Sequence, residues 1–219
     1  MDQQHGGALR TLSGAAQIAG TVVTAPILRR RYNRWGATDA EVRASLPGDD
    51  LVPSPRIGYT RAITIEAPLA DVWPWVVQMG QGRGGFYSYD GLENLVRCNI
   101  TSADRILPEH QSLQPGDIVR LGPTGYPCFR AVLVEPPTDL VLLGADPQPP
   151  HELGSVDKPP GVATWQWALR PTPDGATRLI ARQRLAYPDR FGPMWHIVEP
   201  IGFVMEKQML MGIKARAER

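Results

Sequence analysis

The sequence predicts an α+β fold in which an antiparallel sheet packs against one long C-terminal helix. Three observations lead to this prediction. A strand pattern, a helix pattern and a glycine-rich turn follow one another between Tyr59 and Glu93, short apolar runs separated by proline and glycine follow Pro115, and helical periodicity returns at Met194. The 22 prolines and 22 glycines favour many turns between short strands rather than a helical bundle.

The first strand and helix are predicted from periodicity. Arg61, Ile63 and Ile65 alternate with polar or small residues, as in a strand with one wet face. After Pro68 the apolar residues recur with helical spacing, and a second short helix is expected at Ser88 to Arg97. The apolar positions of the first helix are Val72, Trp75, Val76 and Met79. The glycines at 80–85 follow a helix, so they are interpreted as a turn and not as a phosphate loop.

The second half of the chain predicts the rest of the sheet and the closing helix. Strands are expected at Asp117–Leu121, Cys128–Glu135, Leu140–Ala145, Ala163–Arg170 and Arg178–Tyr187, with a surface loop at Pro147–Gly161. The closing helix is expected at Met194–Arg219, where apolar or small residues step by three and four. Pro200 either begins the main helix or kinks it.

Length and composition limit the function classes. A chain of 219 residues accommodates one domain of about 150 residues and a tail. The net charge of +1 lacks the broad basic surface of nucleic-acid binders, so no nucleic-acid partner is expected. Cys98 and Cys128 form neither a disulfide scaffold nor a zinc motif, which favours a reduced, cytoplasmic compartment. No metal and no cofactor are expected.

The N-terminal segment is organised differently from the rest of the chain. The first ten residues are expected to be a loose terminus. No charge occurs from Thr11 to Leu28, and Arg29, Arg30 and Arg31 follow at once, as in a membrane anchor with a cytoplasmic C-terminal side. Polar residues dilute the stretch, so membrane association through 11–31, spanning or surface-lying, and a helix packed on the domain stay open.

The chain is accordingly divided into three parts. Residues 1–35 form the tail and apolar helix, 36–56 a connector, and 57–219 the domain built from the sheet and the closing helix. Within the connector, Thr38 and Glu41 have the spacing of a helix capping box.

This order of elements resembles the START-like (SRPBCC) superfamily, and in particular its bacterial polyketide cyclase/dehydrase-like branch. The matching stretches are ITIEAPLADVWPWVVQMG, RGGFYSYDGLEN, WQWALRP with TRLIARQR, and FVMEKQMLMGIKARAE. The resemblance covers most of Ile57 to Arg219. It implies a helix-grip fold, with a curved antiparallel sheet wrapped around the C-terminal helix and a cavity between them. An apolar small molecule or lipid is the usual occupant, and the superfamily includes carriers, cyclases, aromatases and partner-binding domains.

Candidate catalytic residues are acid/base groups without a specific motif. Two phenols and two carboxyls occur between Tyr87 and Glu93, and they can orient a ligand or transfer protons if burial shifts a pKa. The ordinary alternative is a helix N-terminus with solvated carboxylates. The candidates are Tyr87, Tyr89, Glu93 and His196. His196 and Glu199 have ligand-like spacing, but two ligands do not make a metal site.

Candidate ligand-binding residues are aromatic, thioether and basic. Trp165 and Trp167 share one strand face, and Arg182 on the hairpin partner would bind an acidic head group if it had the same orientation. The alternative is that the tryptophans fill the core and the arginine faces water. The full set is Trp75, Tyr87, Tyr89, Trp165, Trp167, Arg182, Met205 and Met209.

Three functions are compatible with these features. The first is binding or transport of a hydrophobic or amphipathic small molecule between the sheet and the last helix. The second is a polyketide cyclase or dehydratase that uses the tyrosine, glutamate and histidine groups. The third is a protein-interaction module with a filled core. Convergence of the acid/base groups in one cavity distinguishes the second from the first.

Overall fold

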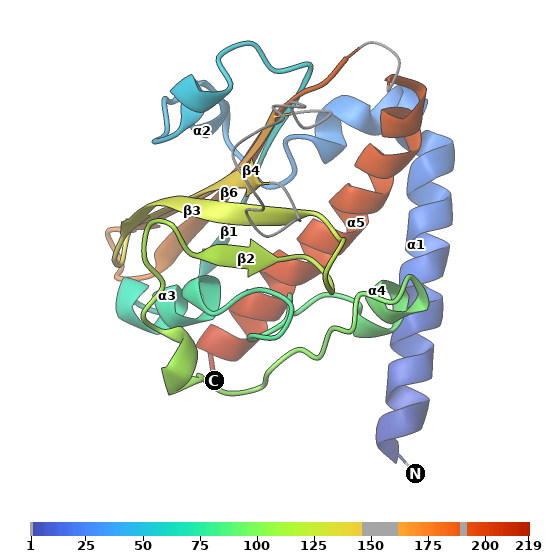
Figure 1. Ribbon diagram of the computed structural model, residues 1–219, viewed down its shortest axis with the longest axis horizontal. Helices are drawn as coiled ribbons and strands as arrows, with labels where there is room; N and C mark the ends of the chain where they lie inside the picture. Colours follow the sequence, from blue (N-terminus) through green and yellow to red (C-terminus); the bar gives the residue numbers. More distant parts are fainter. Residues whose placement is uncertain (1, 146–161, 189–191) are drawn as a thin grey trace.

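The computed structural model describes residues 2–145, 162–188 and 192–219 (Figure 1). One antiparallel sheet has the strand order β1-β6-β5-β4-β3-β2. Its strands are β1 (Ile57–Ile65), β2 (Ile118–Arg120), β3 (Cys128–Glu135), β4 (Asp139–Ala145), β5 (Val162–Pro171) and β6 (Thr177–Ala186). The helices are α1 (Asp2–Tyr32), α2 (Asp39–Arg43), α3 (Leu69–Val77), α4 (Asp90–Leu95) and α5 (Gly192–Ala217), with 3-10 turns at Asp49–Leu51 and Pro108–His110.

The sheet curves around α5, and α1 runs along the outer side of α5 (Figure 1). This is the helix-grip fold, so the predicted fold class is confirmed, including the two short helices after the first strand. The five later strands are found within a residue or two of their predicted bounds. The loop predicted at 147–161 lies outside the described residues.

Local hydrogen bonds close both the glycine-rich turn and the first turn of α2. Gly80 and Gly85 exchange two backbone hydrogen bonds of 3.0 Å, which closes the turn on itself. In the connector, the Thr38 side chain accepts from the Glu41 backbone N–H at 3.2 Å, and the Glu41 carboxylate accepts from the Thr38 N–H at 2.7 Å. The predicted capping box is therefore formed at the start of α2.

The N-terminal helix begins at Asp2, so the expectation of a loose terminus was wrong. The helix packs through one face, on which Thr21 and Ala25 are buried. A Cβ on Gly14 would lie 2.8 Å from Leu92 and 2.9 Å from Tyr89. This close approach to α4 explains why a glycine stands there, and it positions α1 against the domain.

The last helix is continuous from Gly192 to Ala217 and contains Pro200. At Gly212 it lies close to the segment before α4, because a Cβ there would be 2.1 Å from the Tyr87 carbonyl oxygen. Ile213 and Leu210 beside it are fully buried. The C-terminal half of α5 is thereby fixed against the segment that precedes α4.

Replacing Gly212 by Ala is expected to lower the free energy of unfolding by about 1–3 kcal/mol, because the methyl group has no room. This loss exceeds the gain of about 1 kcal/mol that Ala brings to a helix interior. Gly202→Ala on the same helix is the matched control, since nothing lies within 4 Å of a Cβ there. Urea unfolding of both variants measures the difference, and equal stability would contradict the close contact.

Candidate functional site

A cavity of about 690 Å³ lies between the sheet and α5. Five of the six strands contribute to it, with α4, α5 and the loop before β3. The lining is mostly apolar and includes Phe86, Phe129 and Leu185. Trp165 on β5 and Met205 and Met209 on α5 also line it. The volume is in the range of small-molecule sites, which are mostly apolar and carry a few polar groups.

Strand alternation decides which side chains reach the cavity. On β6, Gln183 and Leu185 line it, whereas Arg182 and Arg184 point to the opposite face of the sheet. There Arg182 donates to Asp49 at 2.7 Å and to Thr60 at 3.0 Å, and it is only 4% exposed. Asp49 belongs to the connector, so these arginines fasten the connector to the back of the sheet.

A buried ion pair lies behind the part of the cavity wall that Tyr59 and Glu206 form. Arg61 on β1 is fully buried, and its Nη1 donates to Glu206 Oε2 on α5 at 2.5 Å. Trp165 Nε1 donates to the other Glu206 oxygen at 3.1 Å. The Arg61 guanidinium also lies 3.9 Å from the Tyr59 ring centroid, and burial raises the pKa of the Tyr59 phenol. The pair connects the sheet to α5 and leaves Glu206 with its charge compensated.

Glu93 is the acidic group of the cavity that has no compensating cation. Its Oε2 is buried and has no hydrogen-bond partner among the described residues. Burial, and then the charge of Asp90, raises the pKa of Glu93 to about 8. Asp90 accepts from the Ser102 N–H at 2.7 Å and from its hydroxyl at 2.6 Å. Glu93 is therefore largely protonated at neutral pH and can donate a hydrogen bond into the cavity.

The raised pKa of Glu93 predicts a pH dependence of stability. Between its ordinary value of 4.5 and about 8, the unfolded chain loses this proton while the folded chain keeps it. The free energy of unfolding should therefore fall as pH rises through this window and level off above it. Glu93→Gln, which stays neutral, should lack this component. Thermal unfolding at pH 5, 6, 7 and 8 compares the two proteins, and parallel curves would show that Glu93 is not protonated when folded.

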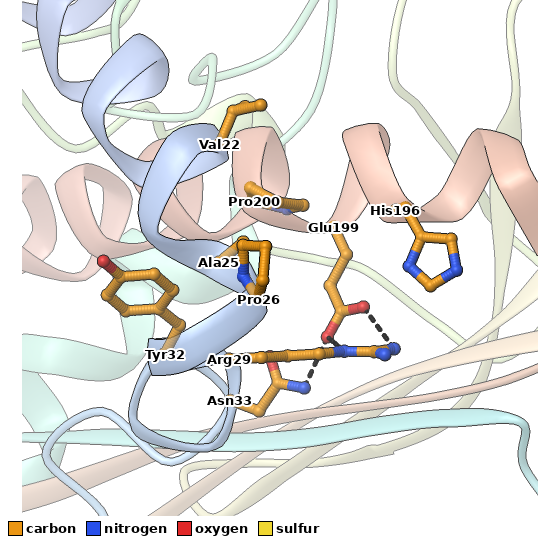
Figure 2. Close-up of a pocket in the computed structure, with 9 residues that line it drawn as sticks. All are labelled: Val22, Ala25, Pro26, Arg29, Tyr32, Asn33, His196, Glu199 and Pro200. Carbon is orange, nitrogen blue, oxygen red and sulfur yellow. Dashed lines mark hydrogen bonds and ion pairs between the residues drawn. The ribbon is translucent and has the colours of Figure 1, made fainter.

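A second cavity, of about 380 Å³, lies between α1 and the first turns of α5 (Figure 2). Glu199 lines both cavities. It accepts from Arg29 Nε at 3.0 Å, pairs with Arg29 Nη2 at 2.6 Å, and accepts a further hydrogen bond from Asn33. Figure 2 shows these contacts converging on the Glu199 carboxylate, whereas His196 lies apart from them. The charge of Glu199 is thus compensated from α1.

The predicted ligand-binding residues divide into two groups. Trp165, Met205 and Met209 line the large cavity. The other five do not: Trp75, Tyr87, Tyr89, Trp167 and Arg182. Trp75 and Tyr87 pack in the hydrophobic core, where their rings meet edge to face with centroids 5.7 Å apart. Trp167 is 1% exposed and packs on Trp165, while Arg182 faces the connector because it has the opposite strand parity.

The four candidate acid/base residues do not share a cavity. Glu93 lines the large one and His196 the smaller one. The Tyr87 hydroxyl donates to the Trp75 carbonyl at 3.1 Å, and the Tyr89 hydroxyl accepts from Gln17 of α1 at 3.0 Å. Both tyrosines are therefore engaged in packing, and the expected constellation of four groups is not assembled. Among the described residues, no cluster of three metal-ligating side chains is present.

Sequence reasoning missed Tyr59 and Glu206 as cavity residues, and it missed Arg61 as the buried partner of Glu206. The sequence periodicity of β1 and α5 did contain a signal for this pair. Arg61 occupies an inward position of β1 with Ile63 and Ile65, and Glu206 lies between two cavity methionines on α5. A charge inside an apolar stripe on each of two packed elements indicates a buried pair, because burial without a partner is strongly unfavourable.

No protein-family model matches the sequence, and no curated protein matches it. Among solved structures, a protein from Rhizobium leguminosarum is similar over 73% of this chain and 95% of its own, with 9% identity and a TM-score of 0.42. DynU16, from the dynemicin biosynthetic locus, covers 72% of this chain and 47% of its own, with 16% identity and a TM-score of 0.40. CalU16 from Micromonospora echinospora covers 74% and 83%, with 14% identity and a TM-score of 0.33. Similarity at this level identifies neither a ligand nor a reaction.

Proposed function

We propose that the protein is a START-like small-molecule binder that holds an uncharged, apolar or amphipathic molecule between the sheet and α5. The observation that carries the proposal is the large cavity, whose walls are apolar and whose lining carboxyl groups are either paired with arginines or protonated. Of its described lining residues, none is Arg, Lys or His, and the ionisable carboxyls are Glu93, Glu199 and Glu206. Two of these are compensated by arginines and the third is held protonated.

This charge balance selects the class of ligand. A free fatty acid or a phosphate ester would bring a negative charge into an apolar site that offers it no described cation, which is unfavourable. A neutral molecule with a carbonyl or hydroxyl group has a hydrogen-bond donor available at Glu93 and apolar surface elsewhere. The sequence suggested a ligand with an acidic head group bound by Arg182. We propose instead that the polar group of the ligand is neutral and lies beside Glu93 on α4.

Fluorescence titration with N-phenylnaphthylamine, a neutral apolar dye, tests the proposal. The dye is expected to bind the folded chain with a 1:1 stoichiometry and to be displaced by a long-chain alcohol. The corresponding fatty acid should displace it less well at pH 7. Native mass spectrometry of protein incubated with the same alcohol should show the complex. Absence of dye binding to folded protein, or preference for the fatty acid, would overturn the proposal.

A further inference from the structure

The outer face of α1 is apolar and uncovered in the part of the molecule that the structure describes. Leu9, Leu12, Val23 and Ile27 are 68%, 67%, 77% and 85% exposed. With the exposed Ala16 and Ala19 between them, these positions step by three or four residues and so share one side of the helix. An exposed apolar strip of this length on a helix that already packs by its other side marks an interaction surface.

Arginines lie at the C-terminal end of this strip. Arg30 follows Ile27 by three residues and Arg31 by four, so both continue the same side of α1, and both are exposed. Neither makes an ion pair with a residue that the structure describes. From Gly7 to Tyr32 the helix contains no acidic residue. The outer face is therefore apolar along its length and positively charged at its end.

The charge extends beyond the helix into a neighbouring groove of about 660 Å³. Arg29, Arg30, Arg34, Arg56, Arg182 and Arg184 line it, and no carboxylate does among the described residues. Asp39, Asp49 and Glu199 pair with four of these arginines from outside the groove. Arg30 makes no ion pair with a residue that the structure describes, and it lies both in this groove and at the end of the apolar strip.

We infer that α1 docks the protein on the surface of an anionic phospholipid bilayer, with the apolar strip in the interface and the arginines at the head groups. A helix with one apolar side and basic residues lies in the membrane interface in this way. The docked helix does not span the bilayer, because its other side is packed against the domain. Its contacts with the domain include the Arg29–Glu199 pair and the hydrogen bond from Arg61 to the Tyr32 carbonyl at 3.0 Å.

Flotation with vesicles tests this inference on the full chain. Wild type is expected to float with vesicles of phosphatidylglycerol and phosphatidylcholine, to float less as salt is raised, and to remain unbound to phosphatidylcholine alone. The double variant Arg30→Glu/Arg31→Glu should lose at least about 25-fold in affinity, since each basic residue near the surface contributes about fivefold. Arg105→Glu/Arg120→Glu, on exposed arginines elsewhere, is the matched control and should bind as wild type.

The apolar strip is tested separately. Val23→Asp/Ile27→Asp should abolish binding to the anionic vesicles while leaving thermal unfolding unchanged, and Met211→Asp on the exposed side of α5 should not. The inference would be overturned by absence of wild-type binding at low salt, by undiminished binding of the Asp pair, or by a lipid-free dimer that the Asp pair dissociates. Resistance to carbonate extraction from vesicles would instead show a spanning helix and would equally overturn it. The vesicle measurements do not depend on occupancy of the cavity between the sheet and α5.

Discussion

Replacing Glu206 by Ala is expected to lower the free energy of unfolding by about 3–5 kcal/mol, because it leaves the charge of Arg61 buried without its partner. Arg61 is fully buried, and no other carboxylate among the described residues pairs with it. The substitution also removes the acceptor of the Trp165 indole N–H. Urea denaturation followed by tryptophan fluorescence measures the change as a shift in the midpoint at constant slope.

Two further variants separate charge from packing. Glu206→Gln keeps the side-chain volume but has a single acceptor oxygen, so only one of Trp165 and Arg61 retains a hydrogen bond to it. It should therefore lose less stability than the alanine variant but remain below wild type. Arg61→Met/Glu206→Leu removes both charges and should recover most of the lost stability, since buried pairs can be replaced by apolar residues of similar size. An alanine variant within about 1 kcal/mol of wild type would show that the pair is solvated, against the described burial.

The sequence predicted those features that depend on local chemistry. The Thr38–Glu41 capping box and the strand Cys128–Glu135 both follow from neighbouring residues, and both are found where they were expected. The N-terminal ten residues were misjudged because they have no periodicity of their own. Their helix is continuous with the apolar segment that packs on α5, so tertiary contacts override the weak local preference.

The candidate site was less predictable, because its composition depends on which way each side chain points. Arg182 and Gln183 are neighbours in sequence but lie on opposite faces of β6, and only the second reaches the cavity. Periodicity identifies two faces without saying which is inside when both carry polar residues. Trp75 and Tyr87 were expected to bind the ligand, but they pack in the core and do not line the cavity. That distinction is set by packing across elements far apart in sequence.

Replacing Gly202 by Phe is expected to narrow the cavity and to reduce binding of the neutral dye at least about tenfold, equivalent to about 1.4 kcal/mol. Gly202 lies on α5, lines the cavity, and has nothing within 4 Å of the place a Cβ would take. The aromatic ring can therefore enter the empty space without displacing core side chains. Because glycine is a poor helix former, stability should stay the same or rise by up to about 1 kcal/mol.

The control at the same position is Gly202→Ala, which adds a single methyl group to a cavity of about 690 Å³. It should share the gain in helix stability and retain dye binding. If the phenylalanine variant loses dye binding while its free energy of unfolding is unchanged, the ligand lies beside α5. If the phenylalanine variant folds normally and still binds the dye as wild type does, then the ligand lies elsewhere, because two bulky groups cannot occupy the same space next to Met205 and Met209.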